Sequence, residues 1–262
     1  EEDYVFEYTL DQLTVEYLLY YFVTFMCVCD LVQLVISIYN VIYMAFRQAV
    51  MSTPFSLLNQ LIFFINDVAF WSYVCALSAV AVNRLFCVAF PVQFKVALHH
   101  ENSKCNFKAR FIPGTSISLP HLHPCCRLLS FPELHTTSYY PFDTWYRYLD
   151  LVTNSLCALT IGISFSLMFY IMRTSSKYAQ IQATWRKREW RLSLQVFLMS
   201  CVYIATFTTY FWLPYLASES HLALIAPSLF VVQNLTHPAI GFIFNPIIRQ
   251  KGLSMLRCKV RE

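Results

Sequence analysis

The sequence predicts an all-α fold, a membrane-embedded bundle of helices, and its composition and its long apolar runs support this. Of the 262 residues, 57% are hydrophobic and only 13% are charged, with a mean hydropathy of +0.48. A soluble domain carries about 25% charged residues, and a disordered chain combines low hydrophobicity with high net charge. The apolar runs exceed the ~20 residues that a helix needs to cross the hydrocarbon core. They are also far longer than the ~10-residue strands of a membrane barrel.

The apolar runs predict membrane-spanning helices at about 17–46, 56–82, 146–172, 192–217 and 221–244. Tyr and Trp stand near several of their ends, as aromatic side chains do at the membrane–water interface. The whole chain, 1–262, is expected to form a single membrane domain. Residues 1–16 carry six acidic and no basic residues and lack the basic-then-apolar pattern of a signal peptide.

Basic residues predict the orientation of the chain, because cytoplasmic loops are enriched in Lys and Arg. Only Arg47, Arg127 and Arg147 lie outside three blocks that hold the rest of the 19 basic residues. We expect all three blocks, including a tail at 249–262, to be cytoplasmic. The blocks are Arg84, Lys95, Lys104, Lys108 and Arg110; Arg173, Lys177, Arg186, Lys187, Arg188 and Arg191; and Arg249, Lys251, Arg257, Lys259 and Arg261.

The stretch 96–145 is where this topology needs one more crossing. The spans ending near Arg84 and Arg173 both finish inside, so the chain has to return outward between them. Yet the stretch contains prolines, histidines and charges, which lipid tolerates poorly. It is therefore either an irregular loop or a degenerate span, the latter around Phe111–Phe131.

Two polar features lie in or beside the first two spans. Asp30 stands in the middle of the first span, and an ionisable side chain at membrane depth is expensive and functional by default. Asn83-Arg84, with Pro91 seven residues after the Arg, stands at the inner end of the second span. Asp30 precedes Arg84 by 54 residues in the sequence.

The last span carries a third motif, His237-Pro238 followed by Asn245 and Arg249. Phe211-Trp212-Leu213-Pro214 lies in the span before it, where Pro214 predicts a kink because it interrupts the hydrogen-bond ladder of a helix. A rival alignment of the last motif centres it on Asn245-Pro246 instead.

Together these motifs resemble those of rhodopsin-like G-protein-coupled receptors, and most closely the nematode serpentine chemoreceptors of the Srx class. The resemblance covers about 17–95 and 145–250. It implies a seven-helix receptor of which this chain retains five or six spans, lacking the first and with a degenerate fourth. The Tyr of the family's last-helix motif is missing here. The family's usual Cys would fall near Asn59, so a disulfide to Cys125 or Cys126 has no obvious partner.

The resemblance implies a chemosensory receptor at the plasma membrane, with a cytoplasmic C-terminus, that binds an extracellular small-molecule or peptide ligand and activates a heterotrimeric G protein. Asp67 is either the counter-ion of a cationic ligand or the partner of another buried polar group. Candidate ligand-binding residues are Asn66, Asp67, Trp71, Tyr210, Trp212, Tyr215 and Gln233. Candidate activation and coupling residues are Asp30, Asn83, Arg84, Pro91, Arg188, His237, Pro238, Asn245 and Arg249.

Other classes of function find less support. The glycines form no phosphate-binding loop, and no metalloprotease motif or nucleophile elbow occurs, so we expect no enzyme, no cofactor and no nucleic-acid partner. His121-Leu122-His123-Pro124-Cys125-Cys126 has zinc-ligand residue types, but its spacing fits no closed site, so no metal is expected. A truncated relative that does not signal and a small transporter remain open, although a transporter would show inverted repeats.

Overall fold

The computed structural model describes residues 21–40, 42, 57–90, 107–131, 136–140, 144–174, 183–216, 225–244 and 249. Only the backbone is described for 107–111, 124, 128–131, 136–138, 140, 183–189, 213–216 and 225–227. The acidic segment 1–16, Pro91, Asn245 and the basic tail beyond Arg249 lie outside the described residues.

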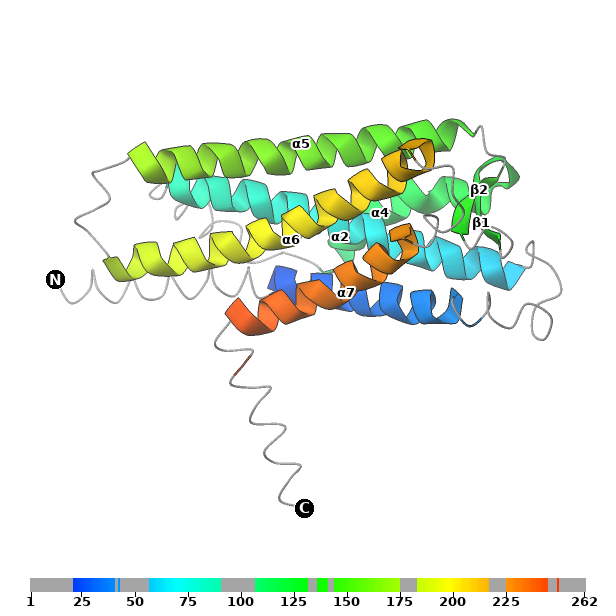
Figure 1. Cartoon of the computed structure of the whole chain (residues 1–262), viewed down its shortest axis with the longest axis horizontal. Coiled ribbons are helices and arrows are strands. Elements are labelled where there is room, and N and C mark those ends of the chain that lie inside the picture. The colour runs from blue at the N-terminus through cyan, green and yellow to red at the C-terminus, as the bar shows by residue number, and fades with distance from the viewer. Residues whose placement is uncertain are drawn as a thin grey trace, which may run out of the picture.

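Long apolar helices dominate the described part of the chain, and they lie side by side as a bundle (Figure 1). Four helical stretches in this part are long and apolar enough to cross a membrane: Tyr21–Asn40, α2 (Leu57–Ala89), α5 (Trp145–Thr174) and Trp190–Trp212 within α6 (Ala183–Leu216). The last predicted span is α7 (Ile225–Phe244), whose apolar part, Ser228–Phe244, is shorter. The prediction of a helical membrane protein is confirmed.

Two helices extend further than the apolar runs predict. α2 continues to Ala89, so Arg84 lies within the helix. α6 begins at Ala183, so the basic residues up to Arg191 are part of the helix rather than of the loop before it. Lys and Arg are good helix formers, and no Gly or Pro interrupts the sequence at either place. Hydropathy identifies only the apolar part of a helix, whereas the helix itself continues until a residue such as Gly or Pro interrupts its backbone hydrogen bonds.

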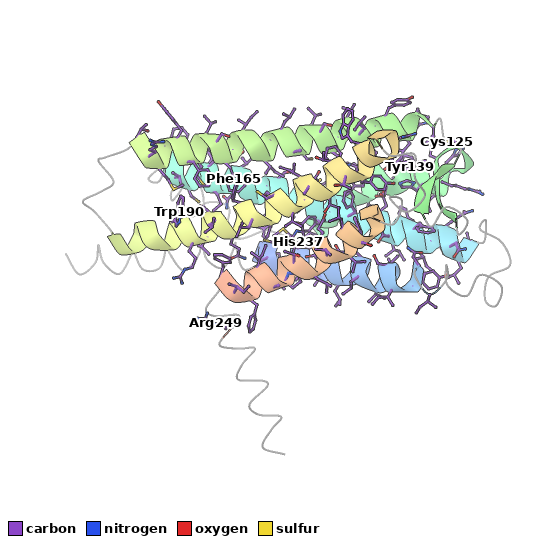
Figure 2. All side chains as sticks on the ribbon, viewed as in Figure 1. Cys125, Tyr139, Phe165, Trp190, His237 and Arg249 are labelled. Atoms are coloured by element: carbon purple, nitrogen blue, oxygen red, sulfur yellow. A yellow bond between two sulfur atoms is a disulfide. The ribbon has the colours of Figure 1, made fainter. Side chains whose placement is uncertain are left out.

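Ring contacts show that α5 and α6 run in opposite directions. Phe165 contacts Phe197 with ring centroids 5.5 Å apart, and Phe169, one turn later on α5, contacts the earlier residue Trp190 of α6, also at 5.5 Å. Figure 2 shows Phe165 and Trp190 on these two helices. α5 and α6 are thus an antiparallel pair.

The helix Tyr21–Asn40 runs opposite to both α2 and α7. Tyr39 near its end donates a hydrogen bond of 3.1 Å to Asn59 near the start of α2, and Asp30 in its middle contacts His237 of α7. α2 and α7 run in the same direction, since Phe70 contacts Phe230 and Tyr73 contacts His237. The described helices therefore alternate in direction along the chain.

Part of the stretch 96–145 folds against one end of the bundle. It contains α4 (Phe107–Ser118), the 3₁₀ helices η1 (Leu119–Leu122) and η2 (Pro124–Cys126), and the strands β1 (Arg127–Phe131) and β2 (Thr136–Tyr140). The strands form an antiparallel hairpin in which Arg127 pairs with Tyr140 and Phe131 with Thr136. We call this end of the bundle the hairpin end. The hairpin is not among the elements that the sequence predicts, because its short strands lie within a proline-interrupted stretch.

α4 lies against α2 and runs antiparallel to it. Gly114 of α4 faces Ser72 and Val68 of α2, and His121, just beyond α4, faces the earlier residue Asp67. At about 1.5 Å per residue, the 12 residues of α4 extend about 18 Å, less than the ~30 Å hydrocarbon core. The crossing predicted between residues 96 and 145 stays a prediction, and α4 contributes a short helix running in the required direction.

α2 is the central helix of the core. Large side chains on several of its faces are fully buried, including Trp71, Tyr73 and Leu77, and the helix contacts α4, α5 and α6. The lipid-facing sides of the neighbouring helices carry exposed apolar residues such as Leu31 and Leu159. A helix that is buried on nearly all sides belongs in the interior of a bundle.

Gly114 sets how closely α4 approaches α2. A Cβ atom at this position would lie 2.8 Å from the Ser72 nitrogen, 2.8 Å from the Val68 carbonyl oxygen and in contact with the Ser72 hydroxyl. Two of these neighbours are backbone atoms, which cannot rotate away. Gly162 on α5, in contrast, has nothing within 4 Å of such a Cβ.

We predict that Gly114→Ala lowers the free energy of unfolding by about 1–3 kcal/mol, as overpacking of a core does. The matched control is Gly162→Ala, which should leave stability unchanged or raise it by up to about 1 kcal/mol through helix propensity. Unfolding in mixed detergent–SDS micelles measures both. Equal stability of the two variants would contradict the close approach of α4 and α2.

Candidate functional site

A first polar cluster lies in the middle of the bundle and joins three helices. We call it the central triad: Asp30 of helix Tyr21–Asn40, Tyr73 of α2 and His237 of α7. All three side chains are at most 1% exposed. His237 Nδ1 lies 3.3 Å from Asp30 Oδ1, and His237 Nε2 lies 3.0 Å from the Tyr73 hydroxyl. The Tyr73 and His237 rings also stack, with centroids 4.8 Å apart.

The hydrogen-bond partners of the His237 imidazole determine where the hydrogens of the central triad lie. The Asp30 carboxylate only accepts, so His237 Nδ1 carries a hydrogen and donates it. In the neutral imidazole, Nε2 then accepts a hydrogen bond from the Tyr73 hydroxyl. The triad therefore places one carboxylate, one imidazole and one phenol in an unbroken chain of hydrogen bonds between three helices.

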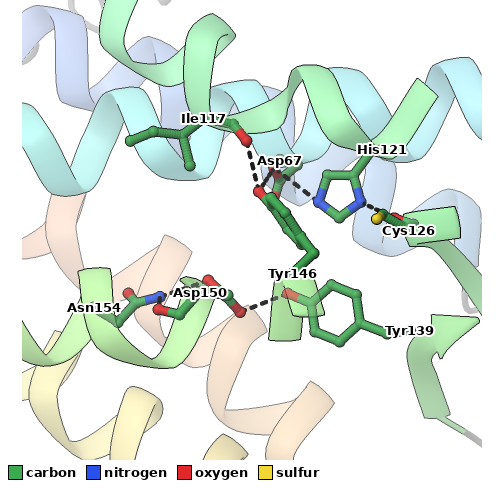
Figure 3. A network of polar contacts seen from close by, with 8 residues as sticks. All are labelled: Asp67, Ile117, His121, Cys126, Tyr139, Tyr146, Asp150 and Asn154. Atoms are coloured by element: carbon green, nitrogen blue, oxygen red, sulfur yellow. Dashed lines mark hydrogen bonds and ion pairs between the residues drawn. The ribbon is translucent and has the colours of Figure 1, made fainter. Parts of the chain in front are cut away.

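A second polar cluster lies at the hairpin end, and Figure 3 shows it from close by. We call it the hairpin-end network: Asp67, His121, Tyr139, Tyr146, Asp150 and Asn154. His121 Nε2 forms an ion pair of 3.1 Å with Asp67 Oδ2, and His121 Nδ1 lies 2.8 Å from the Cys126 carbonyl oxygen. Tyr146 donates to the Ile117 carbonyl at 2.8 Å and lies 3.5 Å from Asp67 Oδ2.

The other carboxylate of the hairpin-end network belongs to α5. Asp150 accepts a hydrogen bond of 2.5 Å from the Tyr139 hydroxyl of the hairpin and one of 2.7 Å from the Asn154 amide. Asn154 in turn accepts a hydrogen bond of 2.8 Å from the Tyr203 hydroxyl of α6. Burial and the nearby Asp150 charge raise the pKa of Tyr139 well above its usual range, so this phenol stays a donor at physiological pH.

Burial and charge act in opposite directions on His121. Burial lowers the pKa of His121, whereas its contact with Asp67, the Cys126 carbonyl and the charge of Asp150 raise it, and the net result is a pKa above the usual value. The imidazole ring is also enclosed by aromatic rings, with the Tyr139 centroid 5.8 Å away and the Tyr146 centroid 4.5 Å away.

Cys125 and Cys126 form a disulfide with each other. The resemblance left these cysteines without an obvious partner near Asn59, and Asn59 instead accepts the hydrogen bond from Tyr39. Thr144 donates to the Cys125 carbonyl at 2.9 Å and lies 3.2 Å from Cys126 Sγ. This loop is therefore tied to the start of α5, and the Cys126 carbonyl is held toward His121.

The predicted ligand-binding residues lie in different surroundings. Asp67 belongs to the hairpin-end network, where it pairs with the buried His121, and its role as the counter-ion of a cationic ligand stays a prediction. Trp71 and Gln233 are fully buried, and Asn66 is partly buried. Tyr210 is 36% and Trp212 is 57% exposed, so Trp212 faces outward from the bundle. Only the backbone of Tyr215 is described.

The predicted activation and coupling residues also lie in different surroundings. Asp30 and His237, taken from two separate motifs, are in direct contact. Arg84 is fully buried, Asn83 is partly buried, and Pro238 lies exposed inside α7. Arg188 lies on α6 with only its backbone described, and Arg249 is exposed.

Several residues of the two clusters were not singled out from the sequence. Asp150 carries a signal, since it is an ionisable residue inside a predicted span, as Asp30 is. Tyr73, Tyr139 and Tyr146 carry none, because a Tyr in or near a span is usually packing or an interface anchor. The sequence marks His121 only as a residue of zinc-ligand type, and its contact with Asp67 follows from how α4 folds back on α2.

The described part of the chain contains no group of three or more His, Cys, Asp or Glu side chains placed to hold a metal ion. No protein-family model matches the sequence, and no curated protein matches it.

We predict that His237→Phe lowers the free energy of unfolding by about 3–5 kcal/mol, because it leaves the Asp30 carboxylate buried without its partner. The double variant Asp30→Leu/His237→Phe replaces both members by apolar groups and should recover much of this loss. Unfolding of the wild type, the two single variants and the double variant in mixed micelles of detergent and SDS measures this double-mutant cycle. Losses that simply add would show that the two side chains do not interact.

Proposed function

We propose that the protein is a chemosensory receptor of the rhodopsin-like type, which binds a small-molecule or peptide ligand at the hairpin end and activates a heterotrimeric G protein at the opposite end. The observation that carries this proposal is the contact between Asp30 and His237. The two residues were identified in separate motifs 207 residues apart, and the receptor resemblance gives both motifs a place in one activation mechanism.

The arrangement of the helices also supports the proposal. α2 is the central helix, and it carries both a proposed ligand-binding residue and a proposed coupling residue. Asp67 lies at its hairpin end, whereas Arg84 is buried near its opposite end. The described helices alternate in direction and a short α4 lies beside α2, an arrangement that supports a receptor bundle with a reduced fourth helix.

Basic residues support the proposed orientation. Arg84, Arg173 and Arg191 lie on the parts of α2, α5 and α6 that are far from the hairpin, and Arg249 follows the end of α7. Because cytoplasmic regions are enriched in Arg and Lys, we place this end in the cytoplasm and the hairpin outside the cell, with the chain in the plasma membrane.

G-protein coupling is tested with the purified chain in lipid nanodiscs and a purified heterotrimeric G protein. We expect agonist-independent nucleotide exchange above that of empty discs, and we expect Arg84→Ala to abolish it. Arg173→Ala is the matched control, because Arg173 is an exposed basic residue at the same end, and it should retain exchange. Equal exchange by wild type and Arg84→Ala would remove Arg84 from the mechanism, and wild-type exchange no higher than empty discs would favour a non-signalling relative.

The orientation is tested in intact cells. An epitope tag inserted between Phe131 and Thr136 should be stained by antibody without permeabilisation, whereas a tag after Glu262 should be stained only after it, as the positive-inside tendency predicts. Staining of the C-terminal tag on intact cells would reverse the proposed topology.

A further inference from the structure

His121 has an acceptor at each of its ring nitrogens. Nδ1 lies 2.8 Å from the Cys126 carbonyl oxygen, and Nε2 lies 3.1 Å from Asp67 Oδ2. A carbonyl oxygen has no hydrogen to donate, so the hydrogen between His121 and Cys126 belongs to Nδ1. A second proton, on Nε2, makes the ring an imidazolium that pairs with the Asp67 carboxylate at 3.1 Å. Without it, a ring lone pair would face a carboxylate oxygen across 3.1 Å.

This second proton lies between parts of the chain that are distant in sequence. His121 belongs to η1, which follows α4, while Asp67 belongs to α2. We call Phe107–Tyr140, excluding the undescribed residues 132–135, the α4–hairpin segment. The contact of His121 with Asp67 is the ion pair that joins this segment to α2 among the described residues, and both side chains are at most 10% exposed.

We propose that His121 and Asp67 form a proton-binding site that controls the docking of the α4–hairpin segment on the bundle. When the proton is bound, the segment is held on α2. When the proton is lost, the contact becomes repulsive and the segment separates from Asp67. The ligand of this site is the proton, so the local pH sets the conformation of the hairpin end.

The groups around His121 restrict where the transition lies. Asp67 faces it from α2, Tyr139 from β2, and Tyr146 and Asp150 from α5. The phenols do not titrate near neutral pH, and Asp150 has its own donors, Tyr139 and Asn154. A response of Asp150 to pH would persist when His121 is replaced, so the variants below separate it from the response of the His121–Asp67 contact.

The sign of the effect follows from the direction of the shift. Contact with Asp67 and with the Cys126 carbonyl outweighs burial and raises the pKa of His121 in the folded chain. A raised folded-state pKa means that the stabilisation is complete below the unfolded value of about 6.5 and is lost as the pH rises through the folded value. Docking is thus complete in acid and released on the alkaline side of about pH 6.5.

The test is amide hydrogen exchange of the purified chain in nanodiscs between about pH 5.5 and 9, corrected for intrinsic exchange rates. Above the transition, exchange of peptides spanning 112–126 should accelerate by up to about tenfold per pH unit, because the protonated fraction falls tenfold per unit. Peptides from α6 should not change. This readout needs neither a ligand nor a G protein, so its failure is distinct from failure of the proposed function.

Three variants identify the groups involved. His121→Phe keeps an aromatic ring but cannot bind the proton, so the pH dependence should disappear. His123→Phe is the matched control, because His123 is exposed in the same segment and only accepts a 3.3 Å hydrogen bond from the Cys125 nitrogen; it should retain the pH dependence. Asp67→Asn keeps His121 but removes the charge, which should move the transition to lower pH.

Two results would overturn the proposal. One is wild-type exchange of 112–126 that does not vary with pH after correction, and the other is a pH dependence that persists unchanged in His121→Phe. If His121→Phe does not fold, Asp67→Asn decides the matter alone, since a transition at the wild-type pH would exclude the His121–Asp67 pair.

Discussion

The pairing of polar side chains inside the bundle is the constraint on which the rest of the structure depends. A charged side chain at the centre of a membrane helix costs about 2.5–3.5 kcal/mol on insertion scales, and lipid offers it no hydrogen-bond partner. Asp30 and Asp67 therefore have to meet donors supplied by other helices. The helices of this protein pack so that each of these carboxylates is met by a histidine, His237 in the middle and His121 at the hairpin end.

α2 is the element that the two clusters share. It contributes Tyr73 to the central triad and Asp67 to the hairpin-end network, about two turns apart on the same helix. Around it, hydrogen bonds to Asp150 and Asn154 connect the hairpin, α5 and α6, while the triad connects the helix Tyr21–Asn40 with α7. Buried polar networks of this kind select one packing arrangement, because a misplaced helix leaves several groups without partners at once.

The same geometry gives the proposed receptor its two ends. The hairpin end, which we propose to lie outside the cell, combines titratable groups with aromatic rings. The opposite end carries the buried Arg84 and several exposed basic residues. Allostery requires two sites linked by an element that both can bias, and α2 carries both Asp67 at the hairpin end and Arg84 near the opposite end.

The membrane-helical class, the approximate spans and the need of Asp30 for a buried partner follow from the sequence, because hydropathy and the cost of a buried charge are local properties of the chain. The sequence does not reveal which residues meet across helices. His121 follows Asp67 by 54 positions and His237 follows Asp30 by 207, so no periodicity relates them. Only the tertiary structure, in which Gly114 allows α4 to fold closely against α2, decided that a proline-interrupted stretch would supply the partner of Asp67.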